Sequence, residues 1–367
     1  MKVSIVSILT TFAIVLFSLA PVPVGGAAET PDPLAPALAH FKAGRTQEAV
    51  AQLKKLIDEK PKDAAPRQAL AEIYLGAKDL NKAEEAYREL IRIDPANAPA
   101  YNNLGILYLK GKRPAEAIQS FRDALEKNPG LTEAHYNLGK VAFMAGELDR
   151  ALESFRKVEG LDKNHPLIHY QIGLVLAGKH RYEEALQEFR KAVSVNPNHP
   201  QISKDLAFTL LAAGKPAESK PEFEKILKTL PASPSARFGL GLSLKALGEK
   251  ERALAQFLKV TEARPELIDA RLHAGDLLKS LGRRKEAVQA YGGTLPLFEK
   301  LLGKDKGHLL ARLRFAKVLI HTGELDRAKE QLKKITKKEK KESALTREAK
   351  ALLDAIEQNR ERGKNKK

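Results

Sequence analysis

A repeat of 34 residues runs through most of this chain and limits its fold more than any other feature of the sequence. A large apolar residue is followed eight residues later by proline, and this pair recurs in steps of 34 residues. The pairs are Leu53–Pro61, Tyr87–Pro95, Phe121–Pro129, Phe189–Pro197, Phe223–Pro231 and Phe257–Pro265. At the remaining step, Phe155, the proline is replaced by Lys163. A period of this length indicates stacked supersecondary units rather than one globular core.

Small residues keep the same step. Alanine recurs at Ala49, Ala83, Ala117, Ala151, Ala185, Ala253 and Ala287, with Ser219 at the one departure, and glycine recurs at Gly105, Gly139, Gly173, Gly241 and Gly275. Small residues let two helices approach closely while large apolar residues fill the holes beside them. Each unit therefore reads as a helical hairpin, which cannot bury its apolar face alone and must stack on its neighbours.

Prolines mark the expected helix ends. Pro129 and Pro197 are expected to end second helices, because proline cannot continue the backbone hydrogen-bond ladder. Pro166, Pro200 and Pro234 are expected to start the next first helices, where a missing donor costs little.

Composition agrees with a helical array. The 367 residues include no Trp and only 6% aromatic residues, which fits helices and fits a β-sandwich or β-barrel poorly. The absence of Cys excludes disulfides and also excludes a lipid-modified amino-terminal cysteine. The formal net charge is +17, and much of it lies in 333–341 and 360–367. Such charge runs are usually solvated, although they can also meet an acidic partner or lipid headgroups.

The seven positions that carry the pattern can be compared with a known family. They are Leu104, Gly105, Tyr108, Ala117, Phe121, Ala124 and Pro129. In this order and spacing the chain resembles the tetratricopeptide repeat (TPR) family. The resemblance implies an all-α fold, a right-handed solenoid of about nine helical hairpins followed by a C-terminal capping helix. The expected repeats are 30–63, 64–97, 98–131, 132–165, 166–199, 200–233, 234–267, 268–301 and 309–342, within an array that covers 29–342.

Three features depart from the regular pattern. Pro221 falls inside an expected second helix and is expected to shift its start. Gly292 and Gly293 interrupt repeat eight, and seven extra residues follow Leu301. This insertion has two interpretations: a loop or short extra helix, or a joint between a rigid block and a mobile end. Residues 343–367 are expected to form the capping helix and a basic tail.

The amino terminus has the parts of a secretory signal. One Lys precedes an uncharged apolar run from Val3 to Ala20, and small residues follow it. We expect residues 1–28 to be a signal peptide that is cleaved after Ala28, which leaves Glu29 as the first mature residue. The apolar run is also long enough to remain as a membrane anchor. Either outcome predicts an exported protein, periplasmic or secreted, and argues against nucleic acid as a partner.

Neither a catalytic nor a metal site is predicted. The sequence has no Cys, no Walker-type phosphate loop and no Ser in a nucleophile-elbow context. His165 and His169 are four residues apart, a spacing that two metal ligands on one helix can have. Pro166 and the lack of an evident third ligand argue against that site. No cofactor is expected.

The resemblance also implies a binding surface. In this family the first helices line a concave groove in which peptides bind, and the matching positions here give eight candidate residues. They are Asn102, Asn103, Tyr136, Asn137, Lys140, Tyr170, Gln171 and Phe208. In one interpretation the amides fix an extended peptide while the aromatic rings form apolar pockets. In the other, the same residues only pack between neighbouring repeats. The family's Lys–Asn clamp for acidic carboxyl termini is present only in fragments.

The sequence therefore predicts a non-catalytic scaffold or adaptor that binds protein segments outside the cytoplasm. One alternative is the peptide-recognition arm of a glycosyltransferase-like system, but the 25 residues after the last repeat are too few for a catalytic domain. Another alternative is a basic surface that binds an anionic polymer or membrane lipid. Membrane association through the amino-terminal segment is a further expectation.

Overall fold

The computed structural model describes residues 32–339 and 343–364, with side chains described as far as residue 358. Within these ranges every regular element is an α-helix, and the helices form a repeat array, which confirms the all-α prediction. Contacts group the chain into two compact units, 1–202 and 203–367. The predicted signal segment, 1–28, lies outside the described residues.

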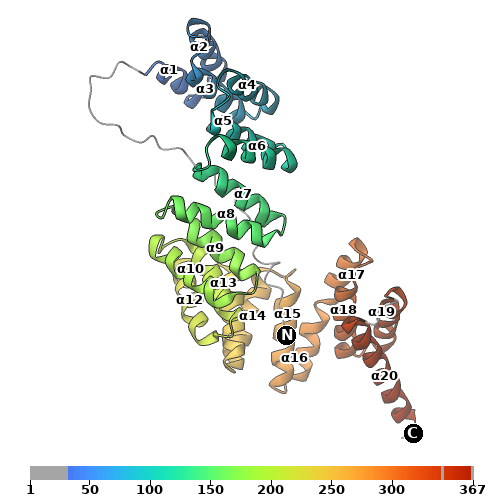
Figure 1. The fold of residues 1–367 in the computed structure, drawn as a ribbon. Helices are drawn as coiled ribbons and strands as arrows, with labels where there is room; N and C mark the ends of the chain where they lie inside the picture. The colour runs from blue at the N-terminus through green and yellow to red at the C-terminus, as the bar shows by residue number, and fades with distance from the viewer. Residues whose placement is uncertain (1–31, 340–342, 365–367) are drawn as a thin grey trace. The chain divides into compact units, whose positions relative to one another are not determined.

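The first unit consists of helix pairs in chain order (Figure 1). Its helices are α1 (Ala35–Lys42), α2 (Thr46–Glu59), α3 (Ala64–Gly76), α4 (Leu80–Ile93), α5 (Ala98–Lys110), α6 (Pro114–Lys127), α7 (Thr132–Met144), α8 (Leu148–Leu161), α9 (Ile168–Gly178) and α10 (Tyr182–Val195). Each odd-numbered helix packs against the even-numbered helix that follows it, and each even-numbered helix from α2 to α8 packs against the next odd-numbered one. This is the stacking that a hairpin with an unburied apolar face requires.

The second unit begins within α11 (Pro200–Ala212). Its further helices are α12 (Pro216–Thr229), α13 (Pro234–Ala246), α14 (Lys250–Ala263), α15 (Ile268–Ser280), α16 (Arg284–Gly292), α17 (Leu295–Lys304), α18 (Leu309–Thr322), α19 (Leu325–Lys338) and α20 (Ala344–Lys364). The last helix, α20, packs against α18 and α19 and buries Ala349 and Ile356.

A glycine faces a phenylalanine ring inside several hairpins. A Cβ atom built on Gly105 would lie 2.6 Å from the Phe121 ring, and one built on Gly139 would lie 2.7 Å from the Phe155 ring. Both rings are fully buried. Separations this short leave no room for a side chain, so the recurring glycine is required by the close approach of the two helices.

The turn inside each repeat contains one residue with a left-handed backbone conformation. These residues are Gly44, Lys78, Lys112, Gly146, His180, Gly214, Gly248, Gly282 and Gly323. Glycine adopts this conformation without a steric cost. Lys78, Lys112 and His180 adopt it with φ between 58° and 63°, so glycine is preferred at this turn but is not essential.

Two expectations about proline are wrong. Pro166 does not start α9, which begins at Ile168, because the Pro166 carbonyl accepts a hydrogen bond from Asn196 Nδ2 (3.0 Å) outside the helix. Pro221 does not shift the start of α12, which begins at Pro216 and runs through it. Pro221 is exposed, while Phe223 on the buried face holds α12 in place despite one lost backbone hydrogen bond. Pro200 and Pro234 do begin helices, as expected.

The interruption in repeat eight forms a short extra helix, the first of its two interpretations. The chain leaves α16 at Gly292 and starts α17 at Leu295, and α17 packs against α18. Phe298 of α17 is 1% exposed and stacks on Phe315 with a ring-centroid separation of 5.6 Å.

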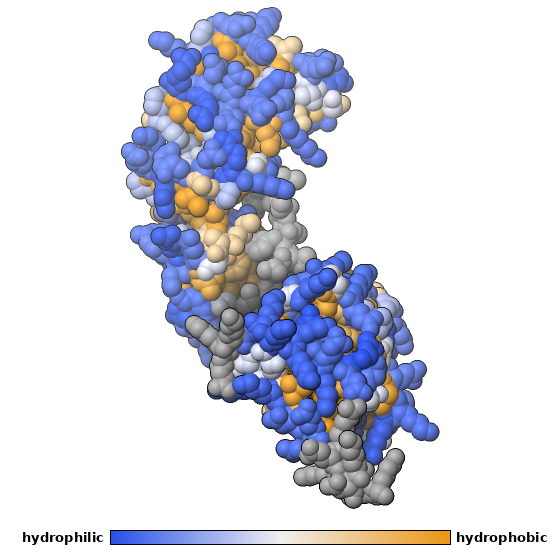
Figure 2. Space-filling model, turned by 90° about the vertical axis from the view of Figure 1, so that its right-hand side faces the viewer, coloured by the Kyte–Doolittle hydropathy of each residue, from blue (hydrophilic) through white to orange (hydrophobic). Residues whose placement is uncertain are grey.

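The surface shown in Figure 2 is mostly hydrophilic, with smaller hydrophobic patches between charged residues. Among the residues that the structure describes, no helix combines the length and the apolar character needed to cross a bilayer.

Candidate binding surface

Seven of the eight predicted site residues lie on the first helices of three consecutive repeats. Asn102 and Asn103 are on α5, Tyr136, Asn137 and Lys140 are on α7, and Tyr170 and Gln171 are on α9. We call these seven residues the first-helix surface. Asn102 and Gln171 are buried, at 5% and 6% exposure, and the other five are partly exposed.

Side-chain hydrogen bonds link neighbouring repeats across this surface. Asn137 Nδ2 donates to Asn102 Oδ1 at 2.9 Å, and Gln171 Nε2 donates to the Tyr136 hydroxyl at 3.1 Å. Both bonds join residues 35 apart, so each connects a first helix with the first helix of the next repeat. Buried amides need such partners. Asn102 and Gln171 therefore act as bridges between repeats, whatever else binds nearby.

The two tyrosines lie against aromatic residues of the core. The Tyr136 ring is 5.8 Å from Phe155 and 4.9 Å from His165, and the Tyr170 ring is 6.0 Å from Phe189, measured between centroids. Burial raises the pKa of the Tyr136 hydroxyl, so this group stays neutral and serves as an acceptor for Gln171. Each tyrosine is rigidly held and only partly exposed.

Lys140 is the one cation of the first-helix surface. Its Nζ atom lies 5.6 Å from the centroid of the Tyr136 ring, and burial lowers the pKa of its ammonium group. It forms no ion pair with any described residue. A partly desolvated ammonium gains free energy when an oxygen acceptor is supplied. Asn137 lies three residues earlier on α7, on the same side of the helix.

Met144 extends this surface, and the sequence analysis missed it. It is four residues after Lys140 on α7 and is 71% exposed. Residues four apart lie on one helix face, so Tyr136, Lys140 and Met144 form one stripe. The spacing was the available signal, but a methionine at helical spacing is more often a core residue.

Phe208, the eighth predicted residue, belongs to the second unit. It lies on α11, is 4% exposed and packs edge-to-face against Phe223 with a centroid separation of 4.9 Å. The structure places it in the hydrophobic core of that unit.

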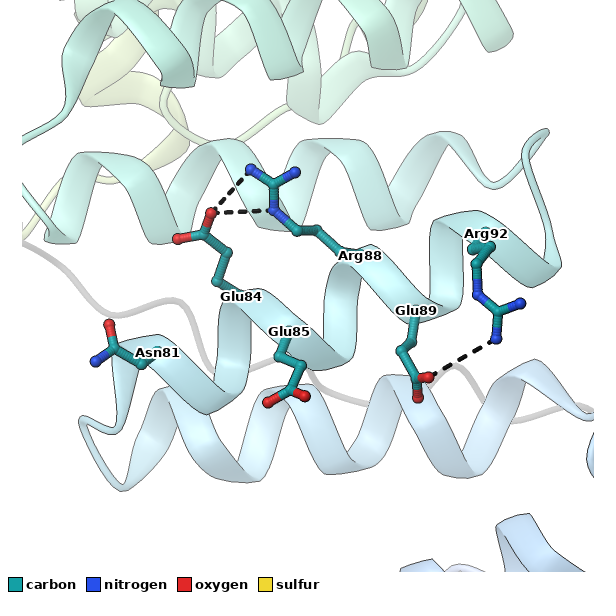
Figure 3. Close-up of a pocket in the computed structure, with 6 residues that line it drawn as sticks. All are labelled: Asn81, Glu84, Glu85, Arg88, Glu89 and Arg92. Carbon is teal, nitrogen blue, oxygen red and sulfur yellow. Dashed lines mark hydrogen bonds and ion pairs between the residues drawn. The ribbon is translucent and has the colours of Figure 1, made fainter.

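A hollow of about 430 Å³ lies on the outer side of α4 (Figure 3). It is lined by Asn81, Glu84, Glu85, Arg88, Glu89 and Arg92. All six residues come from this single helix, and ion pairs join Glu84 with Arg88 and Glu89 with Arg92. These are features of a solvated helix face rather than of a ligand site.

A basic hollow of about 400 Å³ lies in the second unit. It is lined by Lys306, Arg312, Lys334, Lys337 and Lys338, from α18, α19 and the turn before α18. Arg312 is held in place by hydrogen bonds to the Gln331 side chain and to the Lys306 carbonyl. Lys334 pairs with Glu330, whereas the other three lysines form no ion pair with described residues. The basic hollow therefore has unneutralised positive charge.

Comparison with known proteins identifies the repeats. A family model described as tetratricopeptide repeat matches residues 27–291, and a second model with the same description matches 287–356. No curated protein sequence matches the chain significantly.

Solved structures of TPR proteins resemble the chain. One is the carboxyl-terminal part of a TPR protein from Cytophaga hutchinsonii, with 18% identity, 65% of this chain and 97% of that chain covered, and a TM-score of 0.53. Another is a TPR protein from Parabacteroides merdae, with 20% identity, 74% and 98% covered, and a TM-score of 0.51. YrrB, a TPR protein with an unusual peptide-binding site, has 26% identity, 53% and 96% covered, and a TM-score of 0.43. The first two support the fold.

Proposed function

The chain belongs to the tetratricopeptide repeat family, and from this premise we propose that it is a non-catalytic scaffold that binds a protein segment on its first-helix surface. TPR repeats generally mediate protein–protein interactions. The observation that carries the choice of surface is Lys140, a partly buried ammonium that lacks an ion-pair partner among the described residues.

The neighbours of Lys140 fit a peptide chemically. Lys140 would bind a carboxylate or a backbone carbonyl of the segment, and the exposed edges of Tyr136 and Tyr170 would contact its apolar side chains. Met144 adds a flexible apolar contact at the end of α7. Asn137 keeps its Oδ1 atom for a backbone N–H, because its hydrogen bond to Asn102 uses Nδ2.

The two interpretations of the amides are thus combined. Asn102 and Gln171 are buried and bridge neighbouring repeats, which matches the packing interpretation. Asn137, Lys140, Tyr136 and Tyr170 are partly exposed, which the binding interpretation requires. Our proposal therefore assigns contacts with the segment to this second group.

We test the surface by site-specific photo-crosslinking in the native cell. Benzoylphenylalanine replaces Tyr136 or Tyr170, since an aromatic residue of similar shape keeps the packing against Phe155 or Phe189. Matched labels replace Glu153 on α8 and Gln187 on α10, which are exposed on the second helices of the same repeats. The proposal predicts one shared adduct from the two first-helix labels and none from the controls. Adducts only from the controls would contradict it.

We further propose that the protein is exported. The support is the basic start, the apolar run and the small residues within 1–28. Amino-terminal sequencing of the protein from its native cell is expected to start at Glu29. A sequence that starts at Met1 or Lys2 in the membrane fraction would instead support the retained anchor.

The basic hollow supports a second candidate function, the binding of an anionic polymer or of anionic lipid headgroups. Five cationic side chains line it, and counter-charges from described residues neutralise only part of them. Binding to such ligands is expected to weaken steeply as the NaCl concentration rises, because salt screens exposed charges. Binding to anionic vesicles or polymers that does not change with salt would exclude this candidate.

A further inference from the structure

Three potential metal ligands converge where repeats four and five meet. Glu159 lies on α8, His169 on α9 and Glu188 on α10, and one ligand atom from each lies within 4.8 Å of the others. We propose that these three side chains bind a divalent transition-metal ion of the Zn²⁺ type. The site is independent of the first-helix surface and of the function proposed for it.

The donor geometry is close to that of a tetrahedral site. His169 Nδ1 lies 2.8 Å from Glu188 Oε2 and 3.6 Å from Glu159 Oε1. Zinc binds nitrogen and carboxylate oxygen at about 2.0–2.2 Å, which separates neighbouring donors of a tetrahedron by about 3.4 Å. The three donors therefore bracket the required separation, and small side-chain rotations would place all three around one ion.

The remaining carboxylate oxygens are held by cations on the other side. Arg156 donates to Glu159 Oε2 at 2.6 Å and to Glu188 Oε1 at 3.4 Å, and Lys191 donates to Glu188 Oε1 at 3.2 Å. Each cation thus contacts the oxygen that does not face His169. Outer groups that orient the ligands in this way are characteristic of metal sites. An ion can bind without displacing Arg156 or Lys191.

Accessibility also favours an ion. The side chain of Glu188 is 6% exposed, whereas those of His169 and Glu159 are 19% and 24% exposed. An ion could therefore enter from solvent and keep a water molecule as its fourth ligand, as zinc does at sites with three protein ligands. His169 would exchange the proton that it shares with Glu188 for the metal.

The sequence pattern alone pointed to the wrong histidine pair. His165 is not part of this cluster, because its ring packs against Tyr136 at 4.9 Å. The other ligands of His169 come from residues 10 positions before it and 19 positions after it, on neighbouring helices. A bound ion would fasten α8 of one repeat to α9 and α10 of the next.

The test measures metal binding to the full chain after treatment with a chelator. Isothermal titration with Zn²⁺ is expected to show one site per chain, and Co²⁺ is expected to give the visible absorption of a tetrahedral site. Two variants remove ligands with little change in shape. His169→Gln keeps a hydrogen-bond donor for Glu188, and Glu159→Gln keeps an oxygen for Arg156. Each is expected to weaken Zn²⁺ binding at least ~10-fold and to abolish the Co²⁺ spectrum.

Matched controls separate this site from adventitious binding. His180→Asn removes an exposed histidine at a position with φ near 60°, which asparagine tolerates, and Glu153→Gln removes an exposed carboxylate from α8. Both controls are expected to keep wild-type affinity and spectrum. The proposal is overturned if the wild type shows no Zn²⁺ site, or if His169→Gln and the controls bind equally well. Circular dichroism of each variant verifies that the helices are intact.

Discussion

Gly139 illustrates at the scale of one residue why the hairpins need a position without a side chain. A methyl group there would lie 2.7 Å from the Phe155 ring, which is fully buried and cannot move away freely. Gly139→Ala is therefore expected to lower the free energy of unfolding by about 1–3 kcal/mol through overpacking. Urea unfolding followed by circular dichroism measures this loss.

Gly160 supplies the matched control in the same repeat. A Cβ atom there meets nothing within 4 Å, and Gly160 lies within α8. Gly160→Ala is expected to leave the stability unchanged or raise it by up to about 1 kcal/mol, because alanine favours helix. Equal effects of the two substitutions would show that the close approach at Gly139 is not needed.

His273 should make stability depend on pH. Burial beside Phe238 and Phe257, together with the neighbouring Lys245 ammonium, lowers the pKa of His273 to about 4, compared with 6.5 for a free histidine. Between these values the unfolded chain takes up a proton that the folded chain refuses, so stability falls as pH falls from 6.5 towards 4. We expect this residue to account for a loss of about 2 kcal/mol at pH 5.

The variant His273→Asn isolates this contribution, because it removes the titrating group and keeps an acceptor for Lys245. The difference in free energy of unfolding between pH 7 and pH 5 is expected to be smaller in this variant than in the wild type. An identical pH dependence in both proteins would mean that His273 is not neutral by burial.

Single residues also show where sequence reasoning reached its limit. The pairing of Gly139 with Phe155 could be predicted, because one small and one large residue recur at fixed spacing. The left-handed turn residues Lys78 and His180 could not, since both residue types normally avoid that conformation. The hydrogen bond from Asn137 to Asn102 was likewise hidden, because the repeat pattern does not specify which amides pair across helices.

At the scale of helices, Glu84 connects two repeats. It accepts hydrogen bonds from Arg88 on its own helix, from the Tyr108 hydroxyl on α5 at 3.0 Å, and from Arg113 before α6 at 2.7 Å. Burial opposes the charged carboxylate, but these donors outweigh it, and the pKa of Glu84 is lowered from 4.5. Glu84→Gln is expected to destabilise the protein by about 1–2 kcal/mol at pH 7.

The sign of its pH dependence follows from the lowered pKa. The stabilisation by Glu84 is fully present above pH 4.5 and is lost as pH falls through its lower value in the folded protein. The wild type and Glu84→Gln should therefore become equally stable in acid, as measured by urea unfolding at several pH values. Glu89→Gln, an exposed position on the same helix, should show little effect. A gap between wild type and Glu84→Gln that persists in acid would contradict this account.

The helices themselves were largely predictable, whereas their exact ends were not. Second helices start at the expected repeat position even where Pro221 breaks the local rule, because buried anchors such as Phe223 outweigh one lost hydrogen bond. The extra helix α17 could only be given as one of two outcomes. Its formation depends on Phe298 finding a place against Phe315, a long-range contact that local sequence does not encode.

At the scale of the whole molecule, periodicity predicted the all-α repeat array, because every repeat must bury its apolar face on the next. It did not predict that contacts would group residues 1–202 and 203–367 as two units. It also did not identify a partner, since the same helical framework serves many partners and the contacts depend on a few surface residues. Lys140 is such a residue, and only its burial and its missing ion pair distinguish it from the many other lysines.

The most direct measurement is the affinity of the cross-linked partner segment for defined variants. The double substitution Asn137→Ala with Lys140→Ala removes the polar contacts of the first-helix surface, and Lys157→Ala removes an exposed charge from α8 as the control. Titration calorimetry is expected to show binding weakened by at least about 10-fold in the double variant, the loss of a charge-assisted contact, and unchanged in the control. Wild-type affinity in the double variant would contradict the proposed function.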